Sequence, residues 1–381
     1  MTSSWTAPED IAARVRRRWD DGSLLRALAG DESFAGVEVP LRGPKASEIG
    51  DNIAAVRDWV ARLDAGRRDD RSYALQWGAI GGRQIGRNQI PVRAVITTLD
   101  QAWELLGVGR EVRRFSQILE ISADYPAVRA WVCSHPHRAL DIVEDMPRIV
   151  AAYTWLDEHR GAGIYLREIS APGVDTKFAE RHRPVLAQML QVPSTASGFV
   201  TGLGLRLKPD FVRLRPASSL GLPVPLSEVV ARVDEVSGLA LTPTSALVIE
   251  NEITYLSVDV PHDGVVIWGK GFDVDRVGRL PWLAGTDVRY WGDIDTHGFA
   301  ILDRLRAWLP EVRSVLMDRD TLLAHRDRWG RDERPTKSAL SRLVPFEQDL
   351  YEDLVSDVLG ERVRLEQERI DWAWACDHLI G

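Results

Sequence analysis

The sequence predicts a multidomain α/β protein, and two patterns support this prediction. From residue 244 onward, four apolar runs alternate with four helical stretches, which is typical of a mainly parallel sheet with helices on its faces. From residue 7 to residue 66 and again from residue 98 to about residue 160, most apolar residues recur at the three- and four-residue spacing of helices, and a β-rich segment lies between these two regions. At roughly 100 to 200 residues per domain, a chain of 381 residues corresponds to two or three domains.

Residues 1–110 predict an N-terminal arm of helices and strands. PEDIAARVRRRW begins with Pro8, which a first helical turn tolerates, and two acids follow in that turn. YALQWGAI and RNQIPVRAVI alternate or are β-branched, with glycines between them, and predict strands. In DNIAAVRDWVARL, helical spacing predicts a buried face made of Ile53, Val56, Trp59, Val60 and Leu63.

Residues 111–240 predict a helical linker followed by a winged-helix domain. The segment GIYLREI predicts a short strand, and Asp175 or Thr176 is expected to cap the helix that follows. The Gly, Ser and Thr residues at 193–204 and the segment RLRPASSLGLPVP predict a loop-rich wing or linker. Helices, short strands and a loop in this order are consistent with a winged helix.

Residues 241–381 predict a catalytic α/β domain, because acids follow its apolar runs. SALVIE ends in Glu250, VRYWGDID ends in Asp293 and Asp295, and VRSVLMD ends in Asp318, while VVIWGKG ends in a glycine loop with Lys270. Sites in open parallel sheets form beyond the carboxyl ends of the strands. We therefore expect these side chains to gather at one edge of the sheet.

Glu250 and the D-x-D pair Asp293 and Asp295 predict a site for Mg²⁺ or Mn²⁺, which prefer oxygen ligands. Such a site would neutralise a phosphodiester and activate a water molecule, and Glu250 could also accept the proton of that water. The predicted helix after the pair offers backbone N–H groups to a phosphate. Four further residues are candidates to support the site: Glu252, Lys270, His297 and Asp318. The alternative for each is a structural role, as a helix cap, as a packed side chain or as a solvated loop residue.

The charge of the chain is unevenly distributed. The 56 acids and 48 bases give a net charge of −8, which by itself favours an acidic metabolic enzyme over a protein that binds nucleic acid through its field. Residues 244–381 contain 26 acids and 17 bases, whereas the residues before them are nearly neutral. We expect DNA contacts, or alternatively a solvated surface, from six basic residues: Lys177, Arg181, Arg183, Lys208, Arg213 and Arg215.

The cysteines and the hydropathy pattern predict a cytoplasmic protein. Cys133 and Cys376 are too few and too distant in sequence for a disulfide framework or a cysteine metal cluster. The sequence contains no apolar segment typical of a signal peptide and no run long enough to span a membrane.

Several motifs resemble known families. The Toprim domain, in which a strand-end glutamate precedes a D-x-D pair, is resembled by the order ALVIEN, glycine loop and GDIDTHGFAIL. The D-x-D-x-x-G form of the pair resembles that of the A subunit of type IIB topoisomerases. Over nearly its full length, the chain resembles the JetD (MksG) family of nuclease subunits of the Wadjet plasmid-defence system. The motifs of this second resemblance occur in the order WTAPEDI, RNQIPV, PGVDTKFAERH, VIENEITYL, WGDIDTHGF, LMDRDTL and LEQERI.

The resemblance implies a dimeric, nucleoid-associated DNA endonuclease. It implies that closed circular plasmid DNA is cut after an SMC-type ATPase complex, with its kleisin and accessory subunits, presents it. The implied domains are an N-terminal arm, a catabolite-activator-like winged helix and a C-terminal Toprim domain, whose carboxylates match Glu250, Asp293 and Asp295. Unlike the topoisomerase relatives, the chain has no adjacent pair of tyrosines, and Tyr165 lies in a different setting. Metal-activated water is therefore favoured over a covalent tyrosyl intermediate.

Two alternatives remain open at the level of sequence. DIDT resembles the D-x-D-x-T motif of aspartyl-nucleophile phosphatases, although its threonine comes one position early and the motif follows the third apolar run instead of the first. The chain could also be a DNA-binding adaptor that is not catalytic and uses its carboxylates structurally.

Overall fold

The computed structural model describes residues 5–82, 86–222 and 226–379, and this part of the chain has a mixed α/β fold. The chain divides into two compact units, Met1–Leu207 and Lys208–Gly381. Among the described residues, no helix is both long enough and apolar enough to cross a membrane. The three-part division at residues 110 and 240 remains a prediction.

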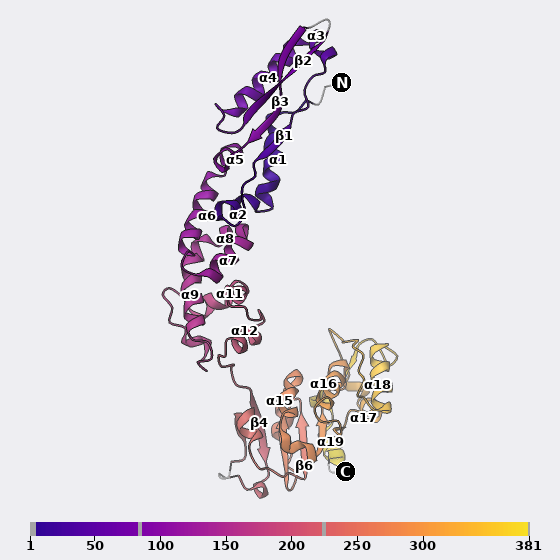
Figure 1. Ribbon diagram of the computed structural model, residues 1–381. Coiled ribbons are helices and arrows are strands. Elements are labelled where there is room, and N and C mark those ends of the chain that lie inside the picture. The colour runs from indigo at the N-terminus through magenta and orange to yellow at the C-terminus, as the bar shows by residue number, and fades with distance from the viewer. Residues whose placement is uncertain (1–4, 83–85, 223–225, 380–381) are drawn as a thin grey trace. The chain divides into compact units, whose positions relative to one another are not determined.

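The N-terminal unit combines a three-stranded antiparallel sheet with a series of helices (Figure 1). The strand order is β1-β3-β2, and β2 and β3 form a long hairpin. The strands are β1 (Val37–Pro40), β2 (Ala74–Gly82) and β3 (Gly86–Ile96). The helices are α1 (Pro8–Asp20), α2 (Ser23–Ala29), α3 (Ala46–Asp51), α4 (Ile53–Arg67), α5 (Leu99–Leu106), α6 (Gly109–Ile121), α7 (Pro126–Ser134), α8 (Pro136–Asp141), α9 (Met146–Glu158), α10 (Thr176–Arg181), α11 (Arg183–Leu190) and α12 (Ala196–Gly202).

Helix α4 buries most of the face that its sequence predicts. Val56, Trp59 and Leu63 are buried, and the Trp59 indole donates a hydrogen bond to the Thr6 carbonyl at 2.8 Å. Ile53 is 53% exposed because it is the first residue of the helix and lies beyond the packed turns. The prediction of a buried face is therefore correct for its central turns and wrong for Ile53.

The segment before α10 differs from the expected strand. Tyr165 makes only an isolated bridge to Arg206, and a 3-10 turn follows directly at Leu166–Glu168. Asp175 caps α10, since its Oδ1 accepts a hydrogen bond from the Phe178 N–H at 2.7 Å. Of the two predicted caps, Asp175 is therefore the correct one.

The C-terminal unit is built around a mixed sheet of six strands in the order β5-β4-β7-β6-β8-β9. The strands β7, β6, β8 and β9 are parallel, while β4 and β5 are antiparallel to their neighbours. The strands of this sheet are β4 (Phe211–Pro216), β5 (Val229–Arg232), β6 (Ser245–Ile249), β7 (Gly264–Trp268), β8 (Asp287–Trp291) and β9 (Arg313–Ser314), and β10 (Gly330–Arg331) pairs with β11 (Val363–Arg364). The helices are α13 (Val233–Ser237), α14 (Glu252–Ser257), α15 (Asp275–Gly278), α16 (Thr296–Arg306), α17 (Arg319–Ala324), α18 (Pro345–Val355) and α19 (Trp372–Leu379).

Two parts of this sheet differ from the sequence expectation. The segment RLRPASSLGLPVP, predicted to be a wing or linker, supplies most of β4, which extends the sheet by pairing with β7 and also pairs with β5. Its residues 223–225 lie outside the described residues, and in the other predicted loop, residues 193–204, Ala196–Gly202 form α12. The fourth predicted strand is only two residues long. It ends early because Leu316 adopts a left-handed φ of 58°, which turns the chain out of the extended conformation.

The central strands are buried on both faces, and this explains their continuous apolar sequence. In β6, every residue from Ala246 to Ile249 is buried, and Val265, Val266 and Ile267 of β7 are fully buried. Strands covered on both faces cannot alternate with polar residues. The register places Ile249 opposite both Trp268 and Trp291, so the carboxyl ends of β6, β7 and β8 lie at one level.

Candidate active site

The ends of β6 and β8 bring Glu250 next to the Asp293 and Asp295 pair. Glu250 is the first residue after β6, and its N–H donates to the Trp291 carbonyl at 3.1 Å. Two residues further along the β8 chain, the Asp293 N–H lies 3.4 Å from Glu250 Oε2. The predicted gathering of the three carboxylates at one sheet edge therefore corresponds to their arrangement in the structure.

Glu250 carries a carboxylate that is held by hydrogen bonds and has no counter-ion of its own. The Tyr290 hydroxyl donates to Glu250 Oε2 at 3.1 Å, and Glu250 makes no ion pair with any described residue. Burial, reinforced by the charges of Asp293 and Asp295, raises the pKa of Glu250 to about 7. This side chain therefore changes its protonation state near neutral pH.

Gly292 allows this close approach. A Cβ at this position would lie 2.9 Å from Glu250 Oε2 and 2.5 Å from the Tyr290 hydroxyl, closer than side chains can pack. Gly298 is similarly constrained, because a Cβ there would collide with the Asp293 carbonyl. Both glycines of the WGDIDTHG motif are thus required by the close contacts around the acids, with side chains at Gly292 and with the backbone at Gly298.

Asp295 has a structural role within the same cluster. Its Oδ1 accepts hydrogen bonds from the N–H groups of His297 at 2.9 Å and Gly298 at 2.7 Å, which caps α16. Burial raises the pKa of Asp295, the Gly298 N–H opposes this rise, and Asp293 adds to it. The N-terminal N–H groups of α16 are therefore directed at an aspartate of the chain itself.

A distant segment, residues 363–369, crosses the D-x-D loop and neutralises part of its charge. Leu365 and Ile294 exchange backbone hydrogen bonds at 3.0 and 2.9 Å. Beside this bridge, Arg364 Nη2 donates to Asp293 Oδ2 at 2.6 Å, and Arg364 Nε lies 3.1 Å from Asp295 Oδ2. Arg364 is thus the counter-ion of both aspartates.

Gln367 connects this segment to both strand ends. Its N–H donates to Asp293 Oδ1 at 2.9 Å, and its side-chain amide donates to the Trp291 carbonyl at 2.7 Å and accepts from the Asn251 N–H at 2.6 Å. The sequence identifies LEQERI as a motif without assigning it a role. Neither Gln367 nor Arg364 is among the predicted site residues; the available signal was that Gln367 lies inside this motif and Arg364 directly before it.

The donor set fits a hard divalent cation in its chemistry and its charge. Three carboxylates and one guanidinium leave an excess of negative charge, and oxygen is the ligand that Mg²⁺ and Mn²⁺ prefer. In the conformation described, however, both carboxylate oxygens of Asp293 and both of Asp295 contact protein groups. No group of three His, Cys, Asp or Glu side chains in the described ranges is arranged to hold a metal ion. Arg364 therefore supplies the positive charge at these aspartates.

The four supporting candidates occupy different surroundings. Glu252 begins α14 and pairs with Arg213, and Asp318 caps α17 by accepting from the Thr321 N–H at 2.8 Å. The imidazole Nε2 of His297 lies 2.7 Å from the Arg334 carbonyl. Lys270 lies over the Trp268 ring, with 5.5 Å between its Nζ and the ring centroid. The structure does not bring any of the four into hydrogen-bond contact with Glu250 or Asp293.

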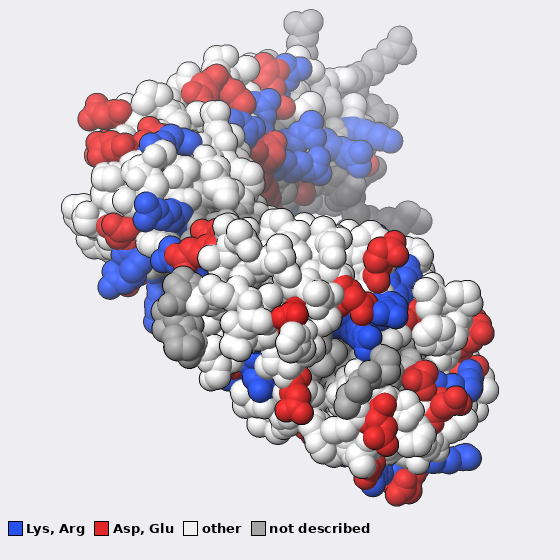
Figure 2. All heavy atoms as spheres, turned by 90° about the horizontal axis from the view of Figure 1, so that it is seen from below, with Lys and Arg blue, Asp and Glu red and all other residues white. Residues whose placement is uncertain are grey.

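The six basic candidates are divided between the two units. In the N-terminal unit, Lys177 and Arg181 are exposed on α10, and Arg183 Nε donates to the Ser194 carbonyl at 2.9 Å. In the C-terminal unit, Arg215 donates to the carbonyls of α14 and of the residue that follows it, at 2.7 and 2.8 Å, while Arg213 pairs with two glutamates. Acidic and basic side chains alternate over much of the face seen in Figure 2, with broad uncharged areas between them.

Two family models together cover almost the whole chain. Residues 204–379 match the model described as Wadjet protein JetD, C-terminal. Residues 8–191 match the model described as an uncharacterized protein conserved in bacteria, N-terminal (DUF3322). A search of curated proteins gave no match. With the strand-end carboxylates lying inside the first matched region, the two matches show that the chain belongs to the Wadjet JetD family.

Proposed function

We propose that this chain is the divalent-metal-dependent DNA endonuclease of a Wadjet-type defence system. Membership of the JetD family indicates a role in Wadjet defence and within its multi-subunit complex. The observation that supports nuclease chemistry is the convergence of Glu250, Asp293 and Asp295 at the carboxyl ends of neighbouring parallel strands. The proposed substrate is closed circular plasmid DNA, and the proposed catalytic domain is of the Toprim type.

Each carboxylate of the cluster has a distinct part in this proposal. Glu250, Asp293 and Asp295 would hold the Mg²⁺ or Mn²⁺. When bound, the metal supplies positive charge to the phosphodiester and makes a water molecule more acidic. Without the metal, burial raises the pKa of Glu250 to about 7, so this carboxylate can hold a proton near neutral pH that binding of the cation would displace. A Glu250 oxygen that does not bind the cation could accept the proton of the water. The hydrogen bond from Tyr290 fixes the orientation of this carboxylate.

The charge of the C-terminal region supports delivery of the DNA by partners. Residues 244–381 carry an excess of nine negative charges, which repels duplex DNA at long range. We therefore propose that an SMC-type ATPase complex with kleisin and accessory subunits presents the DNA to a dimer of this chain. Such a nuclease is inactive toward free DNA until cations and partners bring the substrate to it.

Plasmid cleavage by the assembled complex tests the proposed function. The Glu250→Gln, Asp293→Asn double variant is expected to lose cleavage of supercoiled plasmid in the presence of Mg²⁺ or Mn²⁺, whereas Glu311→Gln, an exposed carboxylate of the same unit, should cleave as the wild type does. Circular dichroism spectra and melting curves show whether each variant folds. Undiminished cleavage by the folded double variant would overturn the site assignment. Normal plasmid restriction by a folded Glu250→Ala variant would favour the adaptor role.

A further inference from the structure

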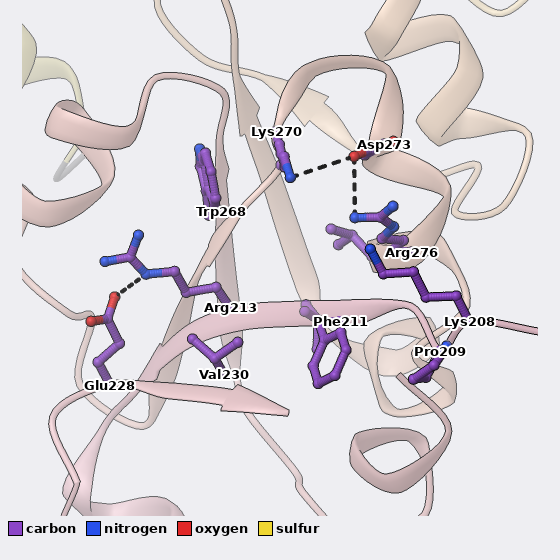
Figure 3. A pocket seen from close by; sticks show the side chains of 13 residues that line it. Lys208, Pro209, Phe211, Arg213, Glu228, Val230, Trp268, Lys270, Asp273 and Arg276 are labelled. Atoms are coloured by element: carbon purple, nitrogen blue, oxygen red, sulfur yellow. Dashed lines mark hydrogen bonds and ion pairs between the residues drawn. The ribbon is translucent and has the colours of Figure 1, made fainter. Parts of the chain in front are cut away.

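A cavity of about 490 Å³ is lined by residues of the C-terminal unit (Figure 3). It lies at β4, β5 and β7, whereas Asp293 follows β8, so β6 separates the two in the order of the sheet. Its walls come from β4, β5, the end of β7 and the turn that leads into α15. This volume is within the range of roughly 300 to 1,000 Å³ that small-ligand sites occupy. The side chains of Lys208, Trp268 and Lys270 lie around its open space.

The positive charge available to a ligand in this cavity comes from two lysines. Arg213 and Arg276 also line the cavity, but each already pairs with two carboxylates. Lys208 makes no hydrogen bond or ion pair with any described residue, and Lys270 is 54% exposed with its only described carboxylate partner, Asp273, at 3.9 Å. The chain has five lysines against 43 arginines, and two of those five are at this cavity.

Two aromatic rings complete the cavity. Phe211 of β4 and Val230 of β5 both line the cavity and are 45% and 60% exposed, so apolar surface in the cavity wall is open to a ligand. Trp268, at the end of β7, contributes the second ring, which is partly buried, and the cationic groups of Lys270 and Arg213 lie over it. Cations combined with an exposed aromatic ring such as Phe211 are the features with which proteins bind unpaired nucleotides, by contacting phosphate and stacking on the base.

The wall of the cavity is connected directly to Glu250. The Trp268 indole donates to the Glu250 carbonyl at 3.0 Å, and the Gly269 N–H donates to the Ile249 carbonyl at 2.7 Å. At Gly271, a Cβ would lie 3.7 Å from Glu250 Oε1. The turn that carries Lys270 therefore passes the carboxylate to which the proposed function assigns chemistry.

We propose that this cavity binds one unpaired nucleotide of the DNA strand that adjoins the cut, with its phosphate at Lys208 and Lys270 and its base against Phe211 and Trp268. The proposal rests on the proposed nuclease function, because it takes the ligand to be part of the same DNA substrate. It assigns to the cavity the task of fixing the position of the strand relative to Glu250.

Fluorescence anisotropy with single strands in the absence of divalent ions tests the proposal. The full-length chain should bind a ten-residue oligothymidylate at least about fivefold more tightly than an abasic phosphodiester strand of the same length, since stacking of one base contributes about 1 kcal/mol or more. Phe211→Ala should remove this preference. The double variant Lys208→Gln, Lys270→Gln should weaken binding of both strands and reduce the salt slope by about 1.4, as expected for two lost phosphate contacts.

Lys337→Gln is the matched control, because Lys337 is an exposed lysine of the same unit with no described partner. Equal affinity of the wild type for the two strands, or identical behaviour of the double lysine variant and the control, would overturn the proposal. The proposal would also be overturned if inorganic phosphate competed for binding as strongly as thymidine monophosphate does. That result would indicate an anion site that does not contact a base.

Photocrosslinking locates the contact and separates this proposal from the proposed function. A strand containing 5-iodouracil should crosslink to peptides that contain Phe211 or Trp268, in the wild type and equally in the Glu250→Gln, Asp293→Asn variant. Crosslinks confined to the N-terminal unit would overturn the cavity assignment. If the strand crosslinks to the cavity but the complex never cleaves plasmid, the nucleotide-binding site is supported and the proposed nuclease function is contradicted. If the complex cleaves plasmid but shows neither a base preference nor a crosslink to the cavity, the nuclease function is supported and the binding site is contradicted.

Discussion

Two buried glutamates of the C-terminal unit, Glu347 and Glu250, have opposite surroundings. Glu347 of α18 has no exposed surface, and the guanidinium of Arg306 donates to both of its oxygens, one of them at 2.9 Å. The Ser314 hydroxyl adds a hydrogen bond to Oε1 at 2.6 Å. This carboxylate is fully paired, and the pair connects α16, α18 and the end of the sheet.

Glu250, at the carboxyl end of β6, lacks such a partner. It accepts one hydrogen bond from Tyr290 and a long one from the Asp293 N–H, and it makes no ion pair among the described residues. Instead, Asp293 and Asp295 add negative charge, and Arg364, the only counter-ion of the cluster among the residues that the structure describes, contacts those two aspartates. The two glutamates therefore differ in charge compensation although both are buried.

This difference shows which feature separates a structural carboxylate from a candidate functional one. Removing a charge from water costs free energy unless the charge is paired, so a fold that keeps a buried acid for stability alone supplies a cation. An acid cluster left with excess negative charge is instead suited to a bound cation or an exchangeable proton. Replacing one carboxylate or one arginine at a time tests this contrast between the two sites.

The largest effect is expected at the compensated site. Glu347→Ala leaves the buried guanidinium of Arg306 without its partner and should lower the free energy of unfolding by about 3 to 5 kcal/mol. Urea denaturation monitored by tryptophan fluorescence measures this loss, and Glu311→Ala on the exposed surface should change it by less than about 0.5 kcal/mol. A loss below 1 kcal/mol at Glu347 would mean that the pair contributes little to stability.

At Glu250 we expect a change of opposite sign that depends on pH. Its pKa of about 7 lies above the ordinary value of 4.5, so the folded chain binds this proton more tightly than the unfolded chain does. The stabilisation is complete below pH 4.5 and is lost as the pH rises to about 7. Glu250→Gln should therefore be about 3 kcal/mol more stable than the wild type at pH 8 without metal, and about equally stable at pH 4.

Thermal unfolding in EDTA between pH 4 and pH 8 checks this expectation. Glu347→Gln is the matched control, because it replaces a buried glutamate that has a cation, and it should be destabilising at pH 8. If Glu250→Gln were equally destabilising there, the two sites would not differ in charge compensation.

The sequence predicts the central strands and the acids at their ends because both leave local signals. Strands covered on both faces appear as continuous apolar runs; β6 lies within its predicted run, and β7 and β8 each begin one residue before theirs. Parallel strands then bring their carboxyl ends to one level, which places Glu250 beside Asp293 and Asp295. These parts of the fold follow from local periodicity and one topological rule.

The counter-ion and the second wall of the cavity could not be predicted in this way. Arg364 lies 71 residues after Asp293 in the chain, and Phe211 belongs to a segment that the glycine and proline content assigns to a wing. Both contacts depend on strand pairing between distant segments, namely the bridge between Ile294 and Leu365 and the pairing of β4 with β7. Periodicity within a segment carries no information about such pairing.

Replacing Arg364 should have a smaller effect than either glutamate change. Arg364→Ala removes the ion pairs to Asp293 and Asp295, but the side chain is 35% exposed, and water partly replaces its contacts. We expect a loss of about 1 to 2 kcal/mol in the free energy of unfolding. Arg364→Lys should recover part of this loss, and the recovery should decrease in 1 M salt. A loss as large as that of Glu347→Ala would show that the acid cluster is compensated as completely as Glu347.

The smallest effect is expected at Asp318, and it separates capping from site chemistry. Asp318 caps α17 as Asp295 caps α16, but it contacts Thr321 and lacks a hydrogen bond to the acid cluster in the described chain. Asp318→Ala should therefore cost about 1 kcal/mol, and Asp318→Asn should cost almost nothing, since asparagine caps equally well. Plasmid cleavage should be unchanged in both variants. If Asp318→Asn abolished cleavage without altering stability, Asp318 would belong to the site, and the lack of a hydrogen bond to the acid cluster would not exclude a carboxylate from it.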